Sequence, residues 1–303
     1  MNKNNSFHPY IKAVGTGTKH NHNLTSSQMH HATDLMLNQD EIYSEQISAF
    51  LLGWRIKGET IDEFKGMLSS FDTFIQKTTI VNSIELGYPY DGKKNNPYLF
   101  SLIAKYLKKF DINIIVSGDK LQPAKNGITV QNICESSKLD FSDNLHYFPR
   151  SKYFKELSNL SEIRNRLGIR TGINSVERLL NPANSSIAFL GVFHKPFMQK
   201  YVEIFAPRYD KLVIVKGNEG TSEIFSKCQY WIAENGNITE YKIDPKDFGI
   251  NYTRSWERIT IEESLEAILN PSKELLNLAK LNAAFILFVS NKVKSIEEGY
   301  EIL

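Results

Sequence analysis

The fold of this chain is decided by residues 78–118, which read TTIVNSIELGYPYDGKKNNPYLFSLIAKYLKKFDINIIVSG. Two apolar runs, at 78–87 and 112–118, each end in glycine, and the segment 98–110 between them carries apolar residues at helical spacing. A strand, a helix and a second strand in this order are typical of parallel pairing, because parallel neighbours need a long crossover. The stretch therefore predicts an α/β fold.

The same alternation continues toward the carboxyl end. Apolar runs at 185–193 and 211–220 flank a helical segment, and an Asn-Gly turn joins two strands within 228–243. Residues 264–303 are mostly helical in pattern. We therefore expect an α/β domain with a mainly parallel central sheet over residues 76–303.

Toward the amino end the pattern becomes entirely helical. Ser26 and Ser27 are candidate caps of one helix, and residues 40–57 form an amphipathic second helix. Thr60 and Glu63 have the spacing of a capping box, which predicts the start of a third helix.

These patterns divide the chain into two parts. We expect a small N-terminal helical domain over residues 1–75, joined by helices from about 160–182, and the larger α/β domain over 76–303. A length of 303 residues suits one large domain or two unequal ones.

Composition indicates an ordinary soluble protein. Hydrophobic residues make up 41% and charged residues 23% of the chain, close to globular averages. Cys134 and Cys228 stand far apart and suggest neither a disulfide framework nor a zinc site. The first thirty residues contain no apolar signal segment, and no stretch is apolar enough to span a bilayer. We expect a cytoplasmic protein with no membrane partner.

The net charge is only +2, but cations are unevenly placed. Residues 1–33 contain three lysines, five of the seven histidines and no acid. Residues 144–182 contain seven Lys or Arg against three acids. This distribution favours a local basic surface over a generally polybasic protein.

Four segments in chain order carry a family resemblance. They are ISAFLLGWRIKGETIDEFKG at 47–66, RNRLGIRTGINSVERLLNP at 164–182, GNITEYKIDPKDFG at 236–249 and LNAAFILFVSNKVKSIEEG at 281–299. Together they resemble the anthranilate phosphoribosyltransferase family, also called glycosyltransferase family 3. The resemblance implies a nucleoside phosphorylase/phosphoribosyltransferase-like fold, in which the small helical domain makes a homodimer and a cleft lies between the two domains.

The loop that such a family uses to hold phosphoribosyl pyrophosphate is altered in this chain. The family's Gly-Thr-Gly-Gly-Asp motif corresponds to GYPYD at 87–91. Pro89 has no N–H to give a phosphate, and Tyr90 takes the volume through which the backbone would approach. The remnants of this donor site are Gly87, Asp91, Gly92 and Gly118.

The other donor motifs are also altered. The family's Asn-x-Ser-Thr run falls at 97–100, which reads PYLF, and its Lys-His-Gly-Asn-Arg motif reads VSGDK at 116–120. The Asp-Glu pair that holds magnesium aligns with Ser222 and Glu223, leaving one carboxylate. We therefore expect no cofactor, and magnesium at Glu223 only if transferase activity is retained.

The arginine segment is better preserved than the donor loop. Arg164 and Arg170 keep the positions of the family's arginine-rich segment, where an arginine meets the anthranilate carboxylate. A second interpretation stays open, in which Arg170 anchors a helix through hydrogen bonds to the backbone.

Aromatic and cationic residues stand side by side in the altered loop. Tyr88 and Tyr90 precede Lys93 and Lys94, a combination that can stack bases and neutralise phosphates. The alternative is that the tyrosines pack in the vacated pocket and the lysines are solvated.

Further features resemble the family's second branch, which binds nucleic acid without sequence preference. They are GTGTKHNH at 15–22, the Tyr-Pro-Tyr loop at 88–90 and RLGIR at 166–170. Our first hypothesis is a homodimer that binds single- or double-stranded nucleic acid through a basic groove. Its predicted contacts are Lys19, Tyr88, Tyr90, Lys93, Lys94, Arg164, Arg166 and Arg170.

Two alternatives remain. The chain is a phosphoribosyltransferase with an altered donor site and an aromatic or purine-like acceptor, in which Asp91 and Glu223 share a metal ion. Otherwise it is a small-molecule sensor that uses the cleft without chemistry.

Overall fold

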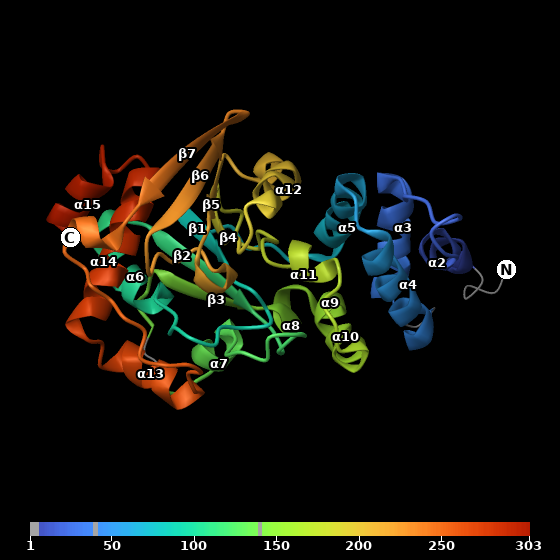
Figure 1. Cartoon of the computed structure of the whole chain (residues 1–303), viewed down its shortest axis with the longest axis horizontal. Helices are drawn as coiled ribbons and strands as arrows, with labels where there is room; N and C mark the ends of the chain where they lie inside the picture. Colours follow the sequence, from blue (N-terminus) through green and yellow to red (C-terminus); the bar gives the residue numbers. More distant parts are fainter. Residues whose placement is uncertain (1–5, 39–41, 139–140) are drawn as a thin grey trace.

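The computed structural model describes residues 6–38, 42–138 and 141–303. The first five residues of the expected helical domain and the start of the helix expected from residue 40 lie outside the described residues. A small helical unit forms one end of the molecule, and a larger α/β unit that carries the carboxyl terminus forms the other (Figure 1).

Among the residues that the structure describes, the N-terminal unit contains four helices: α2 (His8–Gly15), α3 (Ser26–Leu37), α4 (Ser44–Lys57) and α5 (Ile61–Phe74). The cap of α3 is Thr25, whose hydroxyl accepts a hydrogen bond from the Gln28 amide at 3.2 Å. The prediction of Ser26 or Ser27 as the cap is therefore wrong by one or two residues. Both serines are already helical, so their side chains do not take the cap position.

The capping box predicted at Thr60 is confirmed. The Thr60 hydroxyl accepts from the Glu63 amide at 3.3 Å, and the Glu63 carboxylate accepts from the Thr60 amide at 2.8 Å. Glu63 also accepts from the Trp54 indole at 2.8 Å and from the Leu24 amide at 2.9 Å. One buried carboxylate thus joins three segments of the helical unit.

A seven-stranded sheet forms the centre of the larger unit, in the order β3-β2-β1-β4-β5-β6-β7. The first five strands of that order pair in parallel, and the last two are antiparallel, joined by the expected Asn-Gly turn. The predicted mainly parallel sheet is confirmed. The strands are β1 (Ser83–Gly87), β2 (Asn113–Gly118), β3 (Leu145–Pro149), β4 (Ile187–Gly191), β5 (Lys211–Val215), β6 (Cys228–Glu234) and β7 (Asn237–Ile243).

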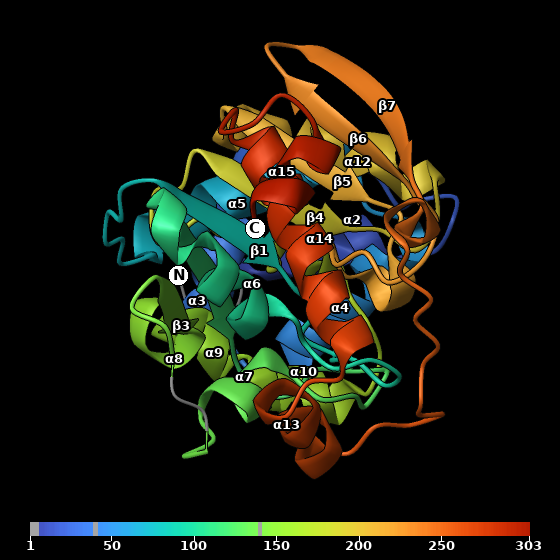
Figure 2. The ribbon, with the colours of Figure 1, turned by 90° about the vertical axis from the view of Figure 1, so that its left-hand side faces the viewer.

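Helices cover both faces of the sheet. One apolar core joins one face to α6, α13, α14 and α15, and Figure 2 shows α14 running across that layer. A second core joins the opposite face to α12 and continues into the helical unit. The bounds are α6 (Phe100–Leu107), α7 (Val130–Cys134), α12 (Pro196–Phe205), α13 (Ile261–Leu269), α14 (Lys273–Val289) and α15 (Ile296–Ile302).

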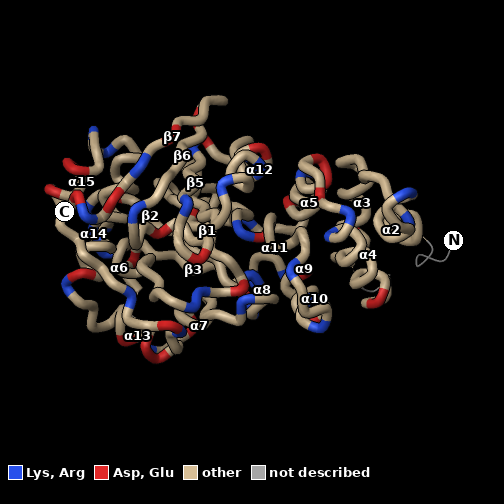
Figure 3. The backbone as a smooth tube through the Cα atoms, in the orientation of Figure 1, with Lys and Arg blue, Asp and Glu red and all other residues tan. Residues whose placement is uncertain are grey.

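Four short helices lie at the junction of the two units: α8 (Arg150–Tyr153), α9 (Lys155–Asn159), α10 (Ser161–Leu167) and α11 (Ile173–Val176). α10 packs on α4. Gly172 lies so close to the Trp54 ring that a Cβ there would be 2.2 Å from it. This segment therefore packs against the helical unit, and Figure 3 shows Lys and Arg positions along it.

Among the described residues, the helices are all too short or too polar to pass through a lipid bilayer.

Candidate functional site

A cleft of about 650 Å³ lies where the carboxyl ends of β1 and β4 meet the end of α4. Ligands of parallel α/β sheets bind outside the carboxyl ends of the strands, so the position is the one expected for a site. The loop after β1, the segment before α11 and the loop after β4 supply most of the lining. The residues that line it include Arg55, Asp91, Lys94, Lys125, Arg170, Thr171, Arg178, Phe193, His194, Phe197, Tyr201 and Glu219.

Next to the cleft lining in the sequence, but outside the lining itself, the chain's own charges form a buried cluster. Glu223 is 2% exposed and Lys93 is 1% exposed, and their charged groups form an ion pair. The Glu223 carboxylate also accepts from the Tyr88 hydroxyl at 3.0 Å and from the Leu99 amide at 2.5 Å. Lys93 donates to the Pro97 carbonyl at 2.7 Å. We call Tyr88, Lys93, Pro97, Leu99 and Glu223 the closed side.

The closed side is also sealed by rings. The Tyr88 and Tyr98 ring centroids are 5.0 Å apart, and the Lys93 ammonium lies 4.9 Å from the Tyr98 centroid. Burial, and after it the charge of Glu223, raises the pKa of Tyr88 well above its ordinary value. The Tyr88 phenol therefore stays a neutral donor to Glu223.

A second buried network lies beneath Tyr90. Arg150 Nε is 2.8 Å from Asp119, and Arg150 Nη1 is 2.5 Å from Glu177. Arg164 meets the same Glu177 carboxylate with two nitrogens, at 2.8 and 2.7 Å. The Arg150 guanidinium stacks 3.7 Å from the centre of the Tyr90 ring. These charges hold α8, α10 and α11 to the end of β2.

Four residues predicted to contact nucleic acid are therefore buried inside the protein. Tyr88, Tyr90, Lys93 and Arg164 are between 1 and 5% exposed, and their partners come from the chain itself. Direct contact with a ligand does not fit Tyr88, Lys93 or Arg164, which lie outside the cleft lining, whereas Tyr90 contributes to the lining although it is 5% exposed. The packing alternative stated for the tyrosines describes them correctly, whereas the lysine beside them is buried instead of solvated.

The lining of the cleft itself keeps cations at least partly open to solvent. The Arg170 side chain is 45% exposed and pairs with Asp91, whose other oxygen lies 3.6 Å from Lys125 Nζ. Burial, followed by the charges of Arg170 and Arg178, lowers the pKa of Lys125, while Asp91 acts in the other direction. Lys94 is half-buried in the lining, and its amide donates to Glu219 at 2.5 Å.

Exposed rings lie in the loop after β4 and in the first turn of α12. Phe193 is 65% exposed and Phe197 is 45% exposed, and the Phe193 and His194 ring centroids are 4.7 Å apart. Phe193 therefore presents a large apolar surface to the cleft. We call the following residues the open side: Arg55, Lys94, Lys125, Arg170, Phe193 and Phe197.

Arg178 has a different role from the other cations of the lining. It is 8% exposed and donates to the carbonyls of Gly87 at 3.1 Å, Gly191 at 2.9 Å and Gly220 at 2.5 Å. Its two terminal nitrogens thus meet backbone carbonyls at the ends of β1 and β4 and at Gly220. This arginine shapes the site, and the backbone-anchoring role considered for Arg170 belongs to it.

The remnant glycines of the donor motif face protein atoms. Gly92 has a φ of 80°, and a Cβ there would lie 2.4 Å from the Gly127 backbone. A Cβ on Gly118 would lie 2.9 Å from the Tyr147 ring. At both positions the absent side chain makes room for the chain's own packing. Gly87 is likewise enclosed by Leu179 and Leu190.

The donor set does not fit magnesium. The carboxylate of Glu223 is paired with an ammonium, and that of Asp91 with a guanidinium, so neither is available as a ligand without breaking a buried ion pair. Within the described ranges, no group of three His, Cys, Asp or Glu side chains gathers in a way that suits a metal ion.

Two predicted contacts, Lys19 and Arg166, are exposed but lie outside the cleft lining. The Arg166 side chain is 73% exposed and pairs with Glu162 one turn earlier on α10. Sequence analysis missed Arg55, Lys125, Phe193 and Phe197. The signal available for Phe193 was its place directly after an apolar strand that ends in Gly191, at the edge where sites form.

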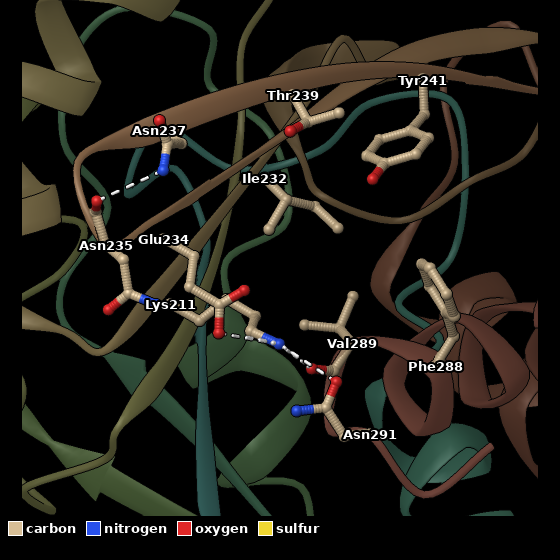
Figure 4. A pocket seen from close by; sticks show the side chains of 10 residues that line it. All are labelled: Lys211, Ile232, Glu234, Asn235, Asn237, Thr239, Tyr241, Phe288, Val289 and Asn291. Atoms are coloured by element: carbon tan, nitrogen blue, oxygen red, sulfur yellow. Dashed lines mark hydrogen bonds and ion pairs between the residues drawn. The ribbon is translucent and has the colours of Figure 1, made fainter. Parts of the chain in front are cut away.

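A second cavity, of about 280 Å³, lies between the β6–β7 hairpin and the end of α14 (Figure 4). Its cation, Lys211, donates to the Val289 carbonyl at 2.8 Å and lies 3.4 Å from both Asn291 Oδ1 and Glu234 Oε1. A cation with three acceptors inside the protein offers little to an anionic ligand.

The comparisons with known proteins agree with this architecture. The sequence matches the glycosyl transferase family helical bundle domain over residues 8–72 and the glycosyl transferase family a/b domain over residues 117–303. The chain belongs to the anthranilate phosphoribosyltransferase-like glycosyl transferase family 3.

Several family members resemble the chain over most of its length. An anthranilate phosphoribosyltransferase of Dictyoglomus thermophilum is 26% identical, covering 97% of this chain and 93% of that protein. An uncharacterised protein of Aquifex aeolicus is 28% identical over 83% of each chain.

Solved structures of the family share the fold. Anthranilate phosphoribosyltransferase from Saccharomyces cerevisiae, in complex with phosphoribosyl pyrophosphate and Mg, superposes with a TM-score of 0.74 at 15% identity, covering 98% of this chain and 92% of that one. The enzyme of Thermus thermophilus gives a TM-score of 0.71 at 16% identity, covering 99% and 93%.

Proposed function

We propose that this family member binds nucleic acid without sequence preference along the open side of its cleft, and that it does not transfer phosphoribosyl groups in the manner of the family. The observation that carries the proposal is the division of the cleft. The carboxylate aligned with the family's magnesium ligands is paired with Lys93, whereas cations and rings on the other side are accessible.

The open side has the chemistry that a nucleic-acid strand requires. Arg55 pairs with Glu59 at 3.6 Å and Arg170 pairs with Asp91, but their side chains are 50% and 45% exposed, so part of each guanidinium faces solvent where phosphate oxygens can approach. Phe193 offers a ring on which a base can stack, and stacking tolerates any base. Phosphate contacts fix position without reading sequence, so the complex is expected to be non-specific.

A homodimer would extend this surface. The helical bundle domain is the dimerisation-type domain of the family, and residues 8–72 match it. In a dimer the exposed cations outside the cleft, Lys19 and Arg166, lengthen the basic surface beyond one protomer. The expected oligomeric state is checked by light scattering of the full chain.

The test is a titration of labelled single-stranded DNA at about 50 and 200 mM salt. Binding should weaken steeply with salt, because each contacted phosphate releases counterions. Lys94→Ala should reduce the slope of the logarithm of the binding constant against that of salt by about 1. Lys105→Ala, an exposed lysine on α6, is the matched control and should leave the slope unchanged. Binding that is absent at low salt, or indifferent to salt, would refute the proposal.

The alternative is a transferase with an altered donor site and an aromatic or purine-like acceptor. It is favoured by the near full-length similarity to enzymes named anthranilate phosphoribosyltransferase. Activity of this kind requires the donor to displace Lys93 from Glu223 or to bind without that carboxylate.

A further inference from the structure

Asp91 already pairs with two cations of the open side, Arg170 and Lys125. Its side chain is 3% exposed, one carboxylate oxygen contacts Arg170, and the other lies 3.6 Å from Lys125 Nζ. Arg170 remains accessible, with 45% of its side chain exposed. The anion position nearest to Arg170 and Lys125 is thus filled by a carboxylate of the protein itself.

We infer that Asp91 is a specificity-determining residue that excludes ligands bearing a single carboxylate and admits extended, multiply charged phosphates; this inference rests on the proposed function of the cleft. The residue acts by competition for Arg170. One Arg170 nitrogen, Nη2, already contacts Asp91 Oδ2, while Asp91 Oδ1 faces Lys125, so an incoming carboxylate meets a cation that has an acidic partner within the protein.

A small carboxylate gains little from this cleft. To bind Arg170 it must either displace Asp91, which leaves that buried carboxylate with only the longer contact to Lys125 at 3.6 Å, or share the cation with a like charge. Neither route gives a net gain in charge pairing. Arg170, at the family's arginine position, is therefore already paired with Asp91 and offers little to an acceptor of the benzoate type.

A chain of phosphates escapes this competition. Its successive charges reach Arg55 and Lys94, which line the same cleft, while Asp91 keeps its place. The free energies of several partial contacts then add, so binding of the nucleic-acid strand does not depend on Arg170 alone. The open side consequently prefers ligands by the number and spacing of their charges.

The test measures benzoate and inorganic pyrophosphate binding to the full chain by ligand-observed NMR and calorimetry. In Asp91→Asn, benzoate affinity should rise by roughly tenfold, as expected when one close charge is removed from a partly exposed site. Pyrophosphate affinity should rise less, by roughly threefold, because it draws on more cations. Asp91→Ser, which also removes the charge, should give the same ranking.

Two controls separate local competition from net charge. Asp210→Asn removes the same charge from an exposed position just before β5, at the opposite end of the sheet, and should change neither affinity. In the double variant Asp91→Asn with Arg170→Gln the benzoate gain should disappear. Equal effects of Asp91→Asn and Asp210→Asn, or a gain that survives the loss of Arg170, would overturn the inference.

These outcomes are independent of nucleic-acid binding. If the DNA titration succeeds and the benzoate gain is absent, this inference fails and the proposed function stands. If the benzoate gain appears and DNA does not bind, the proposed function fails and the role of Asp91 as a competitor for Arg170 stands.

Discussion

The buried cluster called the closed side and the cleft lining called the open side use charge in opposite ways. On the closed side, Lys93 and Glu223 neutralise each other with no more than 2% of either side chain exposed, and Tyr88 and Leu99 complete the contacts of the carboxylate. On the open side, Arg170 pairs with Asp91 and still leaves 45% of its side chain exposed. Charges of the first kind stabilise the fold and those of the second kind are available to a ligand. Burial, more than proximity to the strand ends, separates the two roles.

The largest effect is expected from breaking the closed side. Lys93→Met should lower the free energy of unfolding by about 3–5 kcal/mol, because it leaves the Glu223 charge buried and unpaired. Urea denaturation followed by circular dichroism measures this change. Lys94→Met, at the half-buried neighbouring position, is the matched control and should cost no more than about 0.5 kcal/mol.

Removing both charges separates pairing from packing. In Lys93→Met with Glu223→Gln the loss should shrink well below that of Lys93→Met alone, since no uncompensated charge remains. A single variant as stable as the wild type would show that the closed side is not held by this ion pair.

A smaller, pH-dependent effect on the free energy of unfolding is expected from Glu85, a buried carboxylate on β1 that has no ammonium partner. Burial raises the pKa of Glu85 to about 7, opposed by a hydrogen bond from the Tyr209 hydroxyl at 2.5 Å. The folded state therefore keeps its proton when the unfolded state has lost it. Stability from this group is complete below the unfolded pKa of 4.5 and is lost as the pH rises through about 7.

Urea denaturation at pH 5 and pH 8 tests this statement. The free energy of unfolding should fall by up to about 3 kcal/mol over that interval in the wild type, and Glu85→Gln should remove most of the difference. An unchanged pH dependence in Glu85→Gln would assign the titration to other groups.

The smallest effect concerns the exposed ring of the open side. Phe193→Ala should weaken binding of single-stranded DNA by about 1 kcal/mol through lost stacking, and should leave the free energy of unfolding within about 0.5 kcal/mol. Fluorescence anisotropy with single-stranded and duplex probes of equal length measures it. The duplex serves as the control, because its bases are already stacked. An equal loss for both probes would exclude stacking by Phe193.

Much of the architecture follows from local sequence. The alternation within residues 78–118, the Thr60–Glu63 capping box and the Asn235–Gly236 turn each depend on a few neighbouring residues. Such signals predict secondary structure directly. The cap of α3 was misplaced because Thr25, Ser26 and Ser27 offer three adjacent hydroxyls, and backbone geometry decides among them.

The site was harder to predict because the burial and pairing of its charged side chains depend on partners that are distant in the sequence. Lys93 finds Glu223 at a separation of 130 residues, and Arg170 finds Asp91 at a separation of 79. Nothing in the local sequence distinguishes a lysine that will be buried, such as Lys93, from its neighbour Lys94, which lines the cleft. The altered donor loop was visible in the sequence, but its enclosure by Glu223 required the tertiary structure.

The most direct test of the division between closed and open sides is calorimetry with phosphoribosyl pyrophosphate in the presence and absence of Mg²⁺. We expect weak binding that is lost at higher salt and unaffected by Mg²⁺, with no pyrophosphate released when anthranilate is added. Saturable binding that requires Mg²⁺, accompanied by pyrophosphate release, would contradict this expectation. It would show that the Glu223 carboxylate separates from Lys93 and takes part in binding the donor.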